Sequence, residues 1–155
     1  ARELHSVDPE NLFLYGESRG GMMVLQALRE RFPARAAAIY GAPTNFYALH
    51  EGNPELYDPM ADSLWPGWRE KKDAVFRPRS AVKWVDRIDA PLLVMQGAND
   101  RSIPVSQSLE LISLLNKLGK PYEYVIFGYD NHVLTQHSQE RDARAAAWFR
   151  RHLHN

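Results

Sequence analysis

The fold of this chain is decided by residues 11–32, which read NLFLYGESRGGMMVLQALRERF. The apolar run Asn11–Tyr15 predicts a short strand. The residues after Gly20 predict a helix that stops before Pro33, because apolar side chains recur there every three or four positions. The stretch is therefore a strand, a sharp turn and a helix, with Ser18 at the apex of the turn. The side chains expected on the buried face of this helix are Met22, Leu25, Leu28 and Phe32.

The turn reads Gly16-Glu17-Ser18-Arg19-Gly20 and matches the pattern G-x-S-x-G. In this pattern a serine is exposed on a strained corner between a strand and a helix, where its hydroxyl can act as a nucleophile. Little room is expected for side chains two residues before or after Ser18, and glycine has no Cβ to occupy that room. The pattern is short, and a surface turn with a capping serine has the same residues, so the rest of the chain must decide between them.

Three more apolar runs predict strands, at Ala36–Tyr40, Pro91–Gln96 and Tyr122–Phe127. Helical patterns lie between and after them, at residues 79–88, 105–118 and 136–153. Strands that alternate with helices are typical of an α/β fold with a parallel sheet, here of about four strands with flanking helices. The run Ala36–Tyr40 lacks alternation, as expected for a strand covered on both faces, and Glu123 indicates an outer position for the last strand.

The helical patterns also predict individual positions. Ser80 is a candidate cap of the helix 79–88, and Gly119 is expected to end the helix 105–118. The side chains expected to face inward are Leu109, Ile112, Leu115 and Leu118 in the helix 105–118, and Ala143, Ala146, Ala147 and Phe149 in the last helix.

Residues 44–73 are the least regular part of the sequence and contain Pro54, Pro59 and Pro66. We expect loops there, with one or two short helices. Aromatic side chains are frequent in this region, and we expect them in the core or in a lid more than in the wall of a substrate pocket: Phe46, Tyr47, Tyr57, Trp65 and Trp68.

The composition limits the possible functions. With 155 residues the chain is expected to form one domain, and its 19 lysines and arginines balance 19 aspartates and glutamates. This balance does not favour nucleic acid or an anionic membrane as a partner, and no apolar run is long enough to span a bilayer. Cysteine is absent, which excludes disulfides, a thiolate nucleophile and a zinc–thiolate site. The absence of cysteine also fits a reducing compartment, and we expect the cytoplasm. We expect no metal and no cofactor.

Three polar residues follow three of the expected strands. Ser18 follows the first strand, Asp100 the third and His132 the fourth. The carboxyl ends of parallel strands meet at one edge of a sheet, where sites in open α/β sheets gather. The chain order Ser, Asp, His is also the order of the catalytic residues in α/β-hydrolases. We therefore predict that these three residues form a catalytic triad.

The chemistry of the three side chains assigns their roles. His132 would take the proton of the Ser18 hydroxyl, which is a poor nucleophile without a base. Asp100 would hold the correct tautomer of the imidazole and stabilise the imidazolium. The backbone N–H of Arg19, in the first turn of the helix, would donate a hydrogen bond to the oxyanion.

Other residues compete for these roles. Asp100 is also a good turn residue beside Asn99, whereas Asp86 and Asp89 precede a strand and are poorer candidates. His137 is the main alternative to His132, although it is expected on the last helix. Glu17 adjoins the nucleophile and is either a partly exposed carboxylate or a group that meets the helix N-terminus or a substrate amine. The remaining histidines are weaker candidates: His5, His50, His152 and His154.

Four segments of the sequence are informative together: Gly16–Gly21, Ala90–Gly97, Gly97–Arg101 with Ile103-Pro104 after it, and Tyr129–His132. They resemble the catalytic domain of the prolyl oligopeptidase family of serine peptidases. The resemblance spans essentially the whole chain and implies Ser18, Asp100 and His132 as the catalytic triad.

The resemblance also implies that residues 1–155 are the C-terminal part of an α/β-hydrolase domain. Domains of this family carry several strands before the serine turn, and one of the loops there supplies a second oxyanion donor. The strand Asn11–Tyr15 would then present an unpaired apolar edge, which favours association. We expect self-association or a second chain that completes the sheet, and weak or no activity of this chain alone, because loss of one oxyanion donor costs about 10²- to 10³-fold in rate.

The sequence leaves three functions open. The leading one is a serine peptidase that cleaves peptide or amide bonds through an acyl-enzyme. An esterase of the same fold forms the same intermediate and has the same triad, and a non-catalytic hydrolase-like module used for binding is the third possibility. A dinucleotide- or phosphate-binding unit is not supported, because its fingerprint needs a glycine at the position of Ser18 or a Gly-Lys pair.

Overall fold

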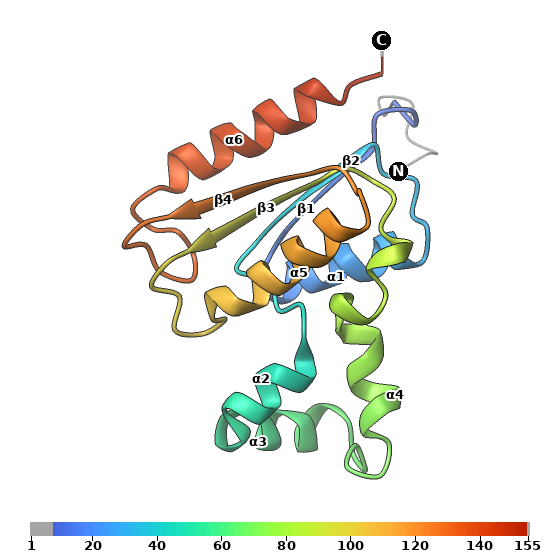
Figure 1. Ribbon diagram of the computed structural model, residues 1–155, viewed down its shortest axis with the longest axis vertical. Coiled ribbons are helices and arrows are strands. Elements are labelled where there is room, and N and C mark those ends of the chain that lie inside the picture. Colours follow the sequence, from blue (N-terminus) through green and yellow to red (C-terminus); the bar gives the residue numbers. More distant parts are fainter. Residues whose placement is uncertain (1–7, 155) are drawn as a thin grey trace.

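Four parallel strands form a single sheet in the order β1-β2-β3-β4 in the computed structural model, which describes residues 8–154 (Figure 1). The strands are β1 (Phe13–Glu17), β2 (Ala36–Tyr40), β3 (Leu92–Gly97) and β4 (Tyr122–Phe127). The predicted four-stranded parallel sheet is thereby confirmed, with β4 at one edge as Glu123 indicated. The first strand begins two residues later than predicted and includes Glu17, so the turn before the helix is reduced to Ser18.

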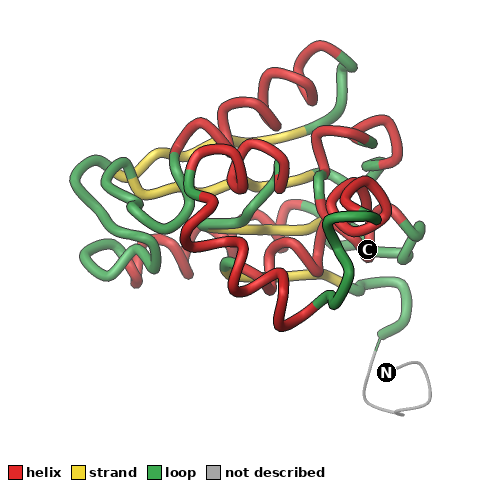
Figure 2. Tube along the Cα trace, turned by 90° about the horizontal axis from the view of Figure 1, so that it is seen from below, coloured by secondary structure: helices red, strands yellow, loops and turns green. Residues whose placement is uncertain are grey.

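Helices cover both faces of the sheet. Helices α1 (Arg19–Arg29) and α5 (Val105–Lys117) lie on one face, and α6 (Ser138–Arg151) lies on the other (Figure 1). Every residue of β2 and β3 is buried as a result, which is why both strands read as unbroken apolar runs. Figure 2 shows the strands side by side behind the helices when the molecule is seen from below.

A smaller helical layer lies beyond α1 and α5 (Figure 1). It consists of α2 (Phe46–Gly52), α3 (Pro54–Leu64) and α4 (Lys72–Phe76). Two of these helices, α2 and α3, lie within residues 44–73, in agreement with the one or two short helices predicted there. The layer has its own core, in which the rings of Trp68 and Phe76 stack at a centroid distance of 5.2 Å. The buried members of that core are Met22, Phe46, Ala61, Trp68 and Phe76.

The prediction of a single helix over residues 79–88 is wrong. Three short 3₁₀ turns occupy this region: η1 (Arg77–Arg79), η2 (Ala81–Lys83) and η3 (Val85–Arg87). Ser80 interrupts the helix, because its backbone is not helical and its buried hydroxyl donates to the Phe76 carbonyl and accepts from the Phe46 N–H. Its side chain therefore ties two segments together and does not cap a helix.

The positions predicted to face inward are correct for three of the four residues assigned to the first helix and only partly correct for the later helices. Met22, Leu25 and Leu28 are buried, whereas Phe32 lies beyond the end of α1 and is exposed. On α5 the buried face includes the polar residues Gln107 and Ser108. Because the sequence prediction assigned only apolar residues to the buried face, it placed that face partly on the wrong side of the helix. The side chains placed wrongly are Leu109, Leu118, Ala143 and Ala147, which are exposed, while Leu111, Ala145 and Trp148 are buried instead.

The prediction for Gly119 is confirmed, whereas the prediction for the two glycines beside Ser18 is correct for Gly16 alone. Gly119 has a φ of 63° and follows the end of α5, as predicted for a C-terminal glycine. At the serine turn, a Cβ on Gly16 would lie 2.5 Å from the backbone of Gly20, whereas a Cβ on Gly20 would meet no atom within 4 Å. Of the two glycines that flank Ser18, only Gly16 is required by the space around it.

We predict that Gly16→Ala destabilises the fold by about 1–3 kcal/mol, because strand and helix backbones would have to separate. Gly20→Ala lies in a helix and in open space, so it is expected to change the free energy of unfolding by about 1 kcal/mol or less, in the stabilising direction. Urea unfolding of the two variants measures both changes. Equal losses of stability would contradict the packing described here.

Candidate active site

Ser18 occupies a strained corner between β1 and α1. It is the N-cap residue of α1 with φ 50° and ψ −120°, a conformation that non-glycine residues rarely adopt. Its backbone N–H donates to the carbonyl oxygen of Tyr40 at 2.9 Å, which fixes the turn to the end of β2. The corner aims the hydroxyl away from the sheet toward the loops that follow the other strands.

The structure brings the three predicted residues into one hydrogen-bonded chain. His132 Nε2 lies 2.9 Å from Ser18 Oγ, and His132 Nδ1 lies 2.7 Å from Asp100 Oδ2. With the Nδ1 proton donated to the carboxylate, Nε2 is free to accept the proton of the hydroxyl. This is the arrangement in which a serine becomes a nucleophile.

Asp100 is a fully buried carboxylate with every oxygen occupied. Oδ1 accepts the backbone N–H groups of Ser102 and Ile103 at 2.9 and 2.8 Å. Oδ2 accepts Gln96 Nε2 at 2.9 Å in addition to the imidazole. These bonds offset the cost of burying the charge and fix the direction in which Oδ2 faces His132. Gln96, at the end of β3, was not singled out from the sequence.

His132 is only partly shielded from solvent, with 22% of its side chain exposed. The hydrogen bond to Asp100 raises the pKa of His132 above its usual value, against the opposite effect of burial. The negative charges of Asp100 and Glu17 raise this pKa further. Glu17 itself accepts a hydrogen bond from the Tyr40 hydroxyl, so it is held near the imidazole by a neighbour on β2.

The loop that carries His132 is anchored by a second buried carboxylate, that of Asp130. This group accepts the backbone N–H groups of Asn131, Gln136 and His137 and lies 2.9 Å from His137 Nδ1. Burial alone would raise the pKa of Asp130, but the bonds from His137 and from the backbone hold it below its usual value. His137, the main alternative to His132, therefore orients the loop and does not reach Ser18.

The other histidines lie in other surroundings. His50 pairs with Asp58 in the helical layer, and His152 Nδ1 lies 2.8 Å from the carbonyl oxygen of Trp148. His5 lies outside the described residues. No group of three or more residues of the types that bind metal ions was found among residues 8–154. In the same range, no helix is long and apolar enough to cross a membrane.

Two glycines let the His132 loop approach the sheet. Gly41 follows β2 with a φ of 54°, and a Cβ there would lie 2.8 Å from the carbonyl oxygen of His132. A Cβ on Gly97, at the end of β3, would lie 2.3 Å from the carbonyl oxygen of Asn131. Both glycines directly end an apolar run in the sequence, and this was the available signal for their role.

Arg19 occupies the first position of α1, where a backbone N–H has no acceptor within the helix. The positive end of the helix dipole adds to this N–H, so the position suits an oxyanion. The predicted donor is therefore in a suitable place beside Ser18.

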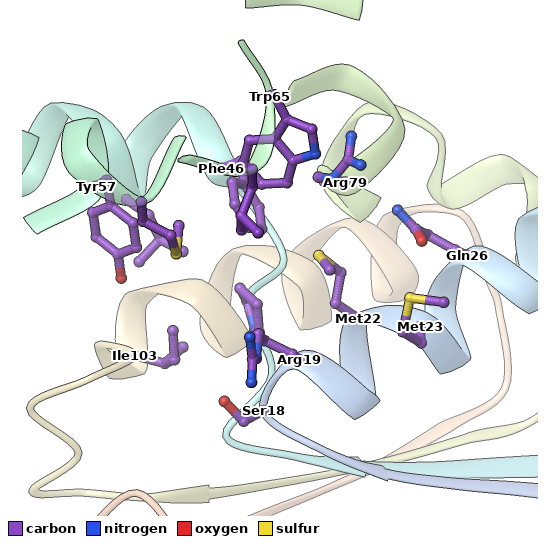
Figure 3. A pocket seen from close by; sticks show the side chains of 14 residues that line it. Ser18, Arg19, Met22, Met23, Gln26, Phe46, Tyr57, Trp65, Arg79 and Ile103 are labelled. Carbon is purple, nitrogen blue, oxygen red and sulfur yellow. The ribbon is translucent and has the colours of Figure 1, made fainter. Parts of the chain in front are cut away.

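A cavity of about 200 Å³ opens beside Ser18, between α1 and the helical layer (Figure 3). Three of the aromatic residues of the irregular region line it: Phe46, Tyr57 and Trp65. The cavity wall is mostly apolar, and its other lining residues are Ser18, Arg19, Met22, Met23, Gln26, Pro43, Leu49, Met60, Leu64, Arg79 and Ile103.

A family model described as the prolyl oligopeptidase family matches residues 1–155. The chain belongs to the prolyl oligopeptidase family. It is 25% identical to the acylamino-acid-releasing enzyme of Rattus norvegicus, over 94% of the chain and 21% of that protein. It is 27% identical to the uncharacterized peptidase YuxL of Bacillus subtilis, over 95% of the chain and 23% of that protein. The chain thus spans about a fifth to a quarter of the length of these relatives.

Solved structures with the same fold support the α/β-hydrolase assignment. The acylaminoacyl peptidase of Pyrococcus horikoshii superposes with a TM-score of 0.80 at 22% identity, over 95% of this chain and 25% of that one. A puromycin-hydrolyzing peptidase of Mycobacterium tuberculosis also gives a TM-score of 0.80, at 24% identity, over 95% of this chain and 22% of that one. The fold of residues 8–154 matches the corresponding portion of these peptidases.

We predict that the reaction of Ser18 with a fluorophosphonate probe accelerates with rising pH through a midpoint above about 6.5, the ordinary histidine value. Below its raised pKa, His132 is an imidazolium and cannot accept the serine proton. Glu17→Gln removes one of the charges that raise this pKa and should lower the midpoint. The measurement is the labelling rate of the full-length protein as a function of pH.

Glu55→Gln is the matched control, because Glu55 is an exposed carboxylate in the first turn of α3. Its midpoint should equal that of the unchanged protein. An equal midpoint in the Glu17 variant would contradict the electrostatic coupling of Glu17 to His132.

Proposed function

We propose that this chain carries the reacting groups of a serine peptidase that cleaves peptide or amide bonds through an acyl-enzyme. The observation that supports the proposal is the hydrogen-bonded chain from Ser18 Oγ through both ring nitrogens of His132 to Asp100. Membership of a family of serine peptidases supports the same reaction class.

The geometry suggests how each group acts. Ser18 Oγ attacks the substrate carbonyl carbon while its proton passes to His132 Nε2, and Asp100 stabilises the imidazolium. The negative charge that develops on the carbonyl oxygen faces the N–H of Arg19. His132 then protonates the leaving amine, and a water molecule activated by the same imidazole releases the acyl group from Ser18.

Two alternatives use the same fold. An esterase would pass through the same acyl-enzyme, but names of relatives such as acylamino-acid-releasing enzyme favour an amide or peptide substrate for this chain too. A non-catalytic binding module is disfavoured, because a fully buried Asp100 directed at His132 costs desolvation energy and serves no evident binding purpose.

We predict that a fluorophosphonate probe labels the full-length protein at Ser18 and that Ser18→Ala abolishes labelling. Only a serine with its proton acceptor in place reacts readily with such a probe. The measurement is the stoichiometry of labelling, with the labelled peptide identified by mass spectrometry.

Ser106→Ala is the matched control, because Ser106 is an exposed serine on α5. It should leave the labelling unchanged. A folded protein that stays unlabelled at every pH would refute the peptidase and esterase proposals together and favour the binding module.

We further propose that the outer edge of β1 is covered in the working protein, either by another strand or by a second copy of this chain. Within residues 8–154, no strand pairs with the outer edge of β1, and its Tyr15 is 44% exposed. An unpaired apolar edge favours association. The same covering segment would be the natural source of a second oxyanion donor beside Ser18.

This proposal predicts that residues 1–155, produced alone, associate in solution. Light scattering after size-exclusion chromatography gives the mass of the species. A well-behaved monomer across a range of concentrations would contradict the proposal.

A further inference from the structure

Gln96 contacts the buried carboxylate of Asp100 directly. It is the next-to-last residue of β3, and only 1% of its surface is exposed. Its side-chain amide donates two hydrogen bonds, one to Asp100 Oδ2 at 2.9 Å and one to the carbonyl oxygen of Ile103 at 3.1 Å. Both N–H groups of the amide are therefore used.

These bonds close a ring around Asp100. Asp100 Oδ1 accepts the backbone N–H of Ile103 at 2.8 Å, and the carbonyl oxygen of the same residue accepts Gln96 Nε2. The ring returns through Nε2 to the second carboxylate oxygen, Oδ2. Because both oxygens belong to the ring, the carboxylate cannot rotate relative to His132 without breaking a hydrogen bond.

The neighbours of the Gln96 amide fix which way it points. Both partners of Nε2 are acceptors, one a carboxylate oxygen and the other a carbonyl oxygen. If Nε2 and Oε1 were exchanged, three oxygen atoms would meet with no hydrogen between them, which is repulsive. In the observed orientation, Oε1 is buried and has no hydrogen-bond partner among residues 8–154.

The unpartnered Oε1 shows that packing does not explain a glutamine at this position. A buried acceptor without a donor costs about 1–3 kcal/mol. A methionine of similar size would fill the same space without that cost. The end of the side chain that has partners is the donor end, so the contribution of Gln96 lies in what Nε2 does to Asp100 Oδ2.

The amide of Gln96 shares its acceptor with the imidazole. Asp100 Oδ2 lies 2.9 Å from Gln96 Nε2 and 2.7 Å from His132 Nδ1. Each donor draws electron density from the oxygen, so the amide weakens the attraction of Oδ2 for the imidazolium. An imidazole that holds its second proton too tightly stays protonated and cannot accept the proton of Ser18.

We propose that Gln96 is a positioning residue of the proposed peptidase reaction, which directs Asp100 Oδ2 at His132 and limits how strongly that oxygen stabilises the imidazolium. Gln96 acts through Asp100 and does not itself react. The proposal rests on the proposed function, because the base that Gln96 adjusts is the one that activates Ser18.

Other charged groups face the same pair and stay unchanged when Gln96 is replaced. The hydrogen bond to Asp100 and the charge of Glu17 on β1 raise the pKa of His132, whereas burial lowers it. A change of pH dependence in a Gln96 variant is read against this constant background. The remaining titratable or charged groups nearby are Tyr57 on α3, Arg101 beside Asp100, and Asp130 with His137 in the His132 loop.

The test measures the rate of fluorophosphonate labelling of Ser18 against pH, in the full-length protein and in its Gln96→Met variant. In this reaction Ser18 Oγ bonds to phosphorus, the P–F bond breaks with loss of fluoride, and the serine proton passes to His132. Methionine keeps the size of the side chain and removes both donors. The midpoint of the pH profile should rise by about half a unit, so labelling below the midpoint should be about three-fold slower.

Gln96→Asn is a second variant that tests the same contact. It keeps an amide but withdraws the donor from Oδ2 by the length of one methylene group, so its midpoint should also rise. Urea unfolding of the variants establishes that each is folded at the pH values used. If Gln96→Met does not fold, the midpoint of Gln96→Asn decides the test.

Gln107→Met is the matched control. Gln107 is also a buried glutamine, but its amide bonds to the backbone of Thr44 and Asn45, in the segment before α2. Its replacement removes packing and hydrogen bonds of the same kind, so any effect on labelling should be equal at every pH. The midpoint should stay that of the unchanged protein.

A purely structural role for Gln96 is the competing explanation, and it predicts slower labelling by one factor at all pH values. Two results would overturn the inference while the proposed function stands. One is a midpoint in the folded Gln96 variants that is equal to or below that of the unchanged protein, and the other is an equal rise in Gln107→Met. An unchanged protein that is folded but never labelled overturns the proposed function and this inference together.

Discussion

Direct contact between backbone segments at the ends of the strands is the constraint on which the site depends. Gly16 packs against the backbone of Gly20, Gly41 against His132, and Gly97 against Asn131. Each contact removes the thickness of a side chain between the sheet and the helix or loop that packs on its end. The hydroxyl of Ser18 and the imidazole of His132 can then meet at 2.9 Å, although they come from opposite edges of the sheet. A Cβ at these positions would push the Ser18 hydroxyl and the His132 imidazole apart without changing the chemistry of either group.

Two buried carboxylates, those of Asp100 and Asp130, fix the position of the His132 imidazole in different ways. Asp100 controls the orientation and the charge of the ring through Nδ1, and Asp130 controls the path of the loop that carries it. The loops are also joined to each other, because the N–H of Asn99 donates to the carbonyl oxygen of Asp130 at 2.8 Å. His132 is thus positioned through both its side chain and its backbone.

Much of the fold could be predicted from the sequence because its signals are local. The strands β2 and β4 were placed at their observed bounds, and the order of the elements along the chain was correct. The helix predicted at residues 79–88 was wrong because a long-range contact decides that region: Ser80 bonds to the backbone of Phe46, far away in sequence. The phase of α5 was missed for a similar reason, since Gln107 is buried by its bonds to the backbone of Thr44 and Asn45.

The residues of the candidate site also differ in whether the sequence could reveal them. Ser18, Asp100 and His132 could be located from the sequence, because each follows a strand and the order matches a known pattern. Gln96 and Asp130 could not, because their importance lies in bonds that only the folded chain forms. The catalytic roles assigned to the three residues remain predictions that the labelling experiments test.

Met22 and Phe46 belong at once to the core of the helical layer and to the wall of the cavity. Reshaping the cavity at either position therefore removes buried packing, so a new substrate preference would arise together with a less stable protein. Met23 and Leu64 also line the cavity but are exposed, and they carry little of the core. Natural divergence of specificity, and any attempt to redirect it in the laboratory, should proceed first through these exposed positions.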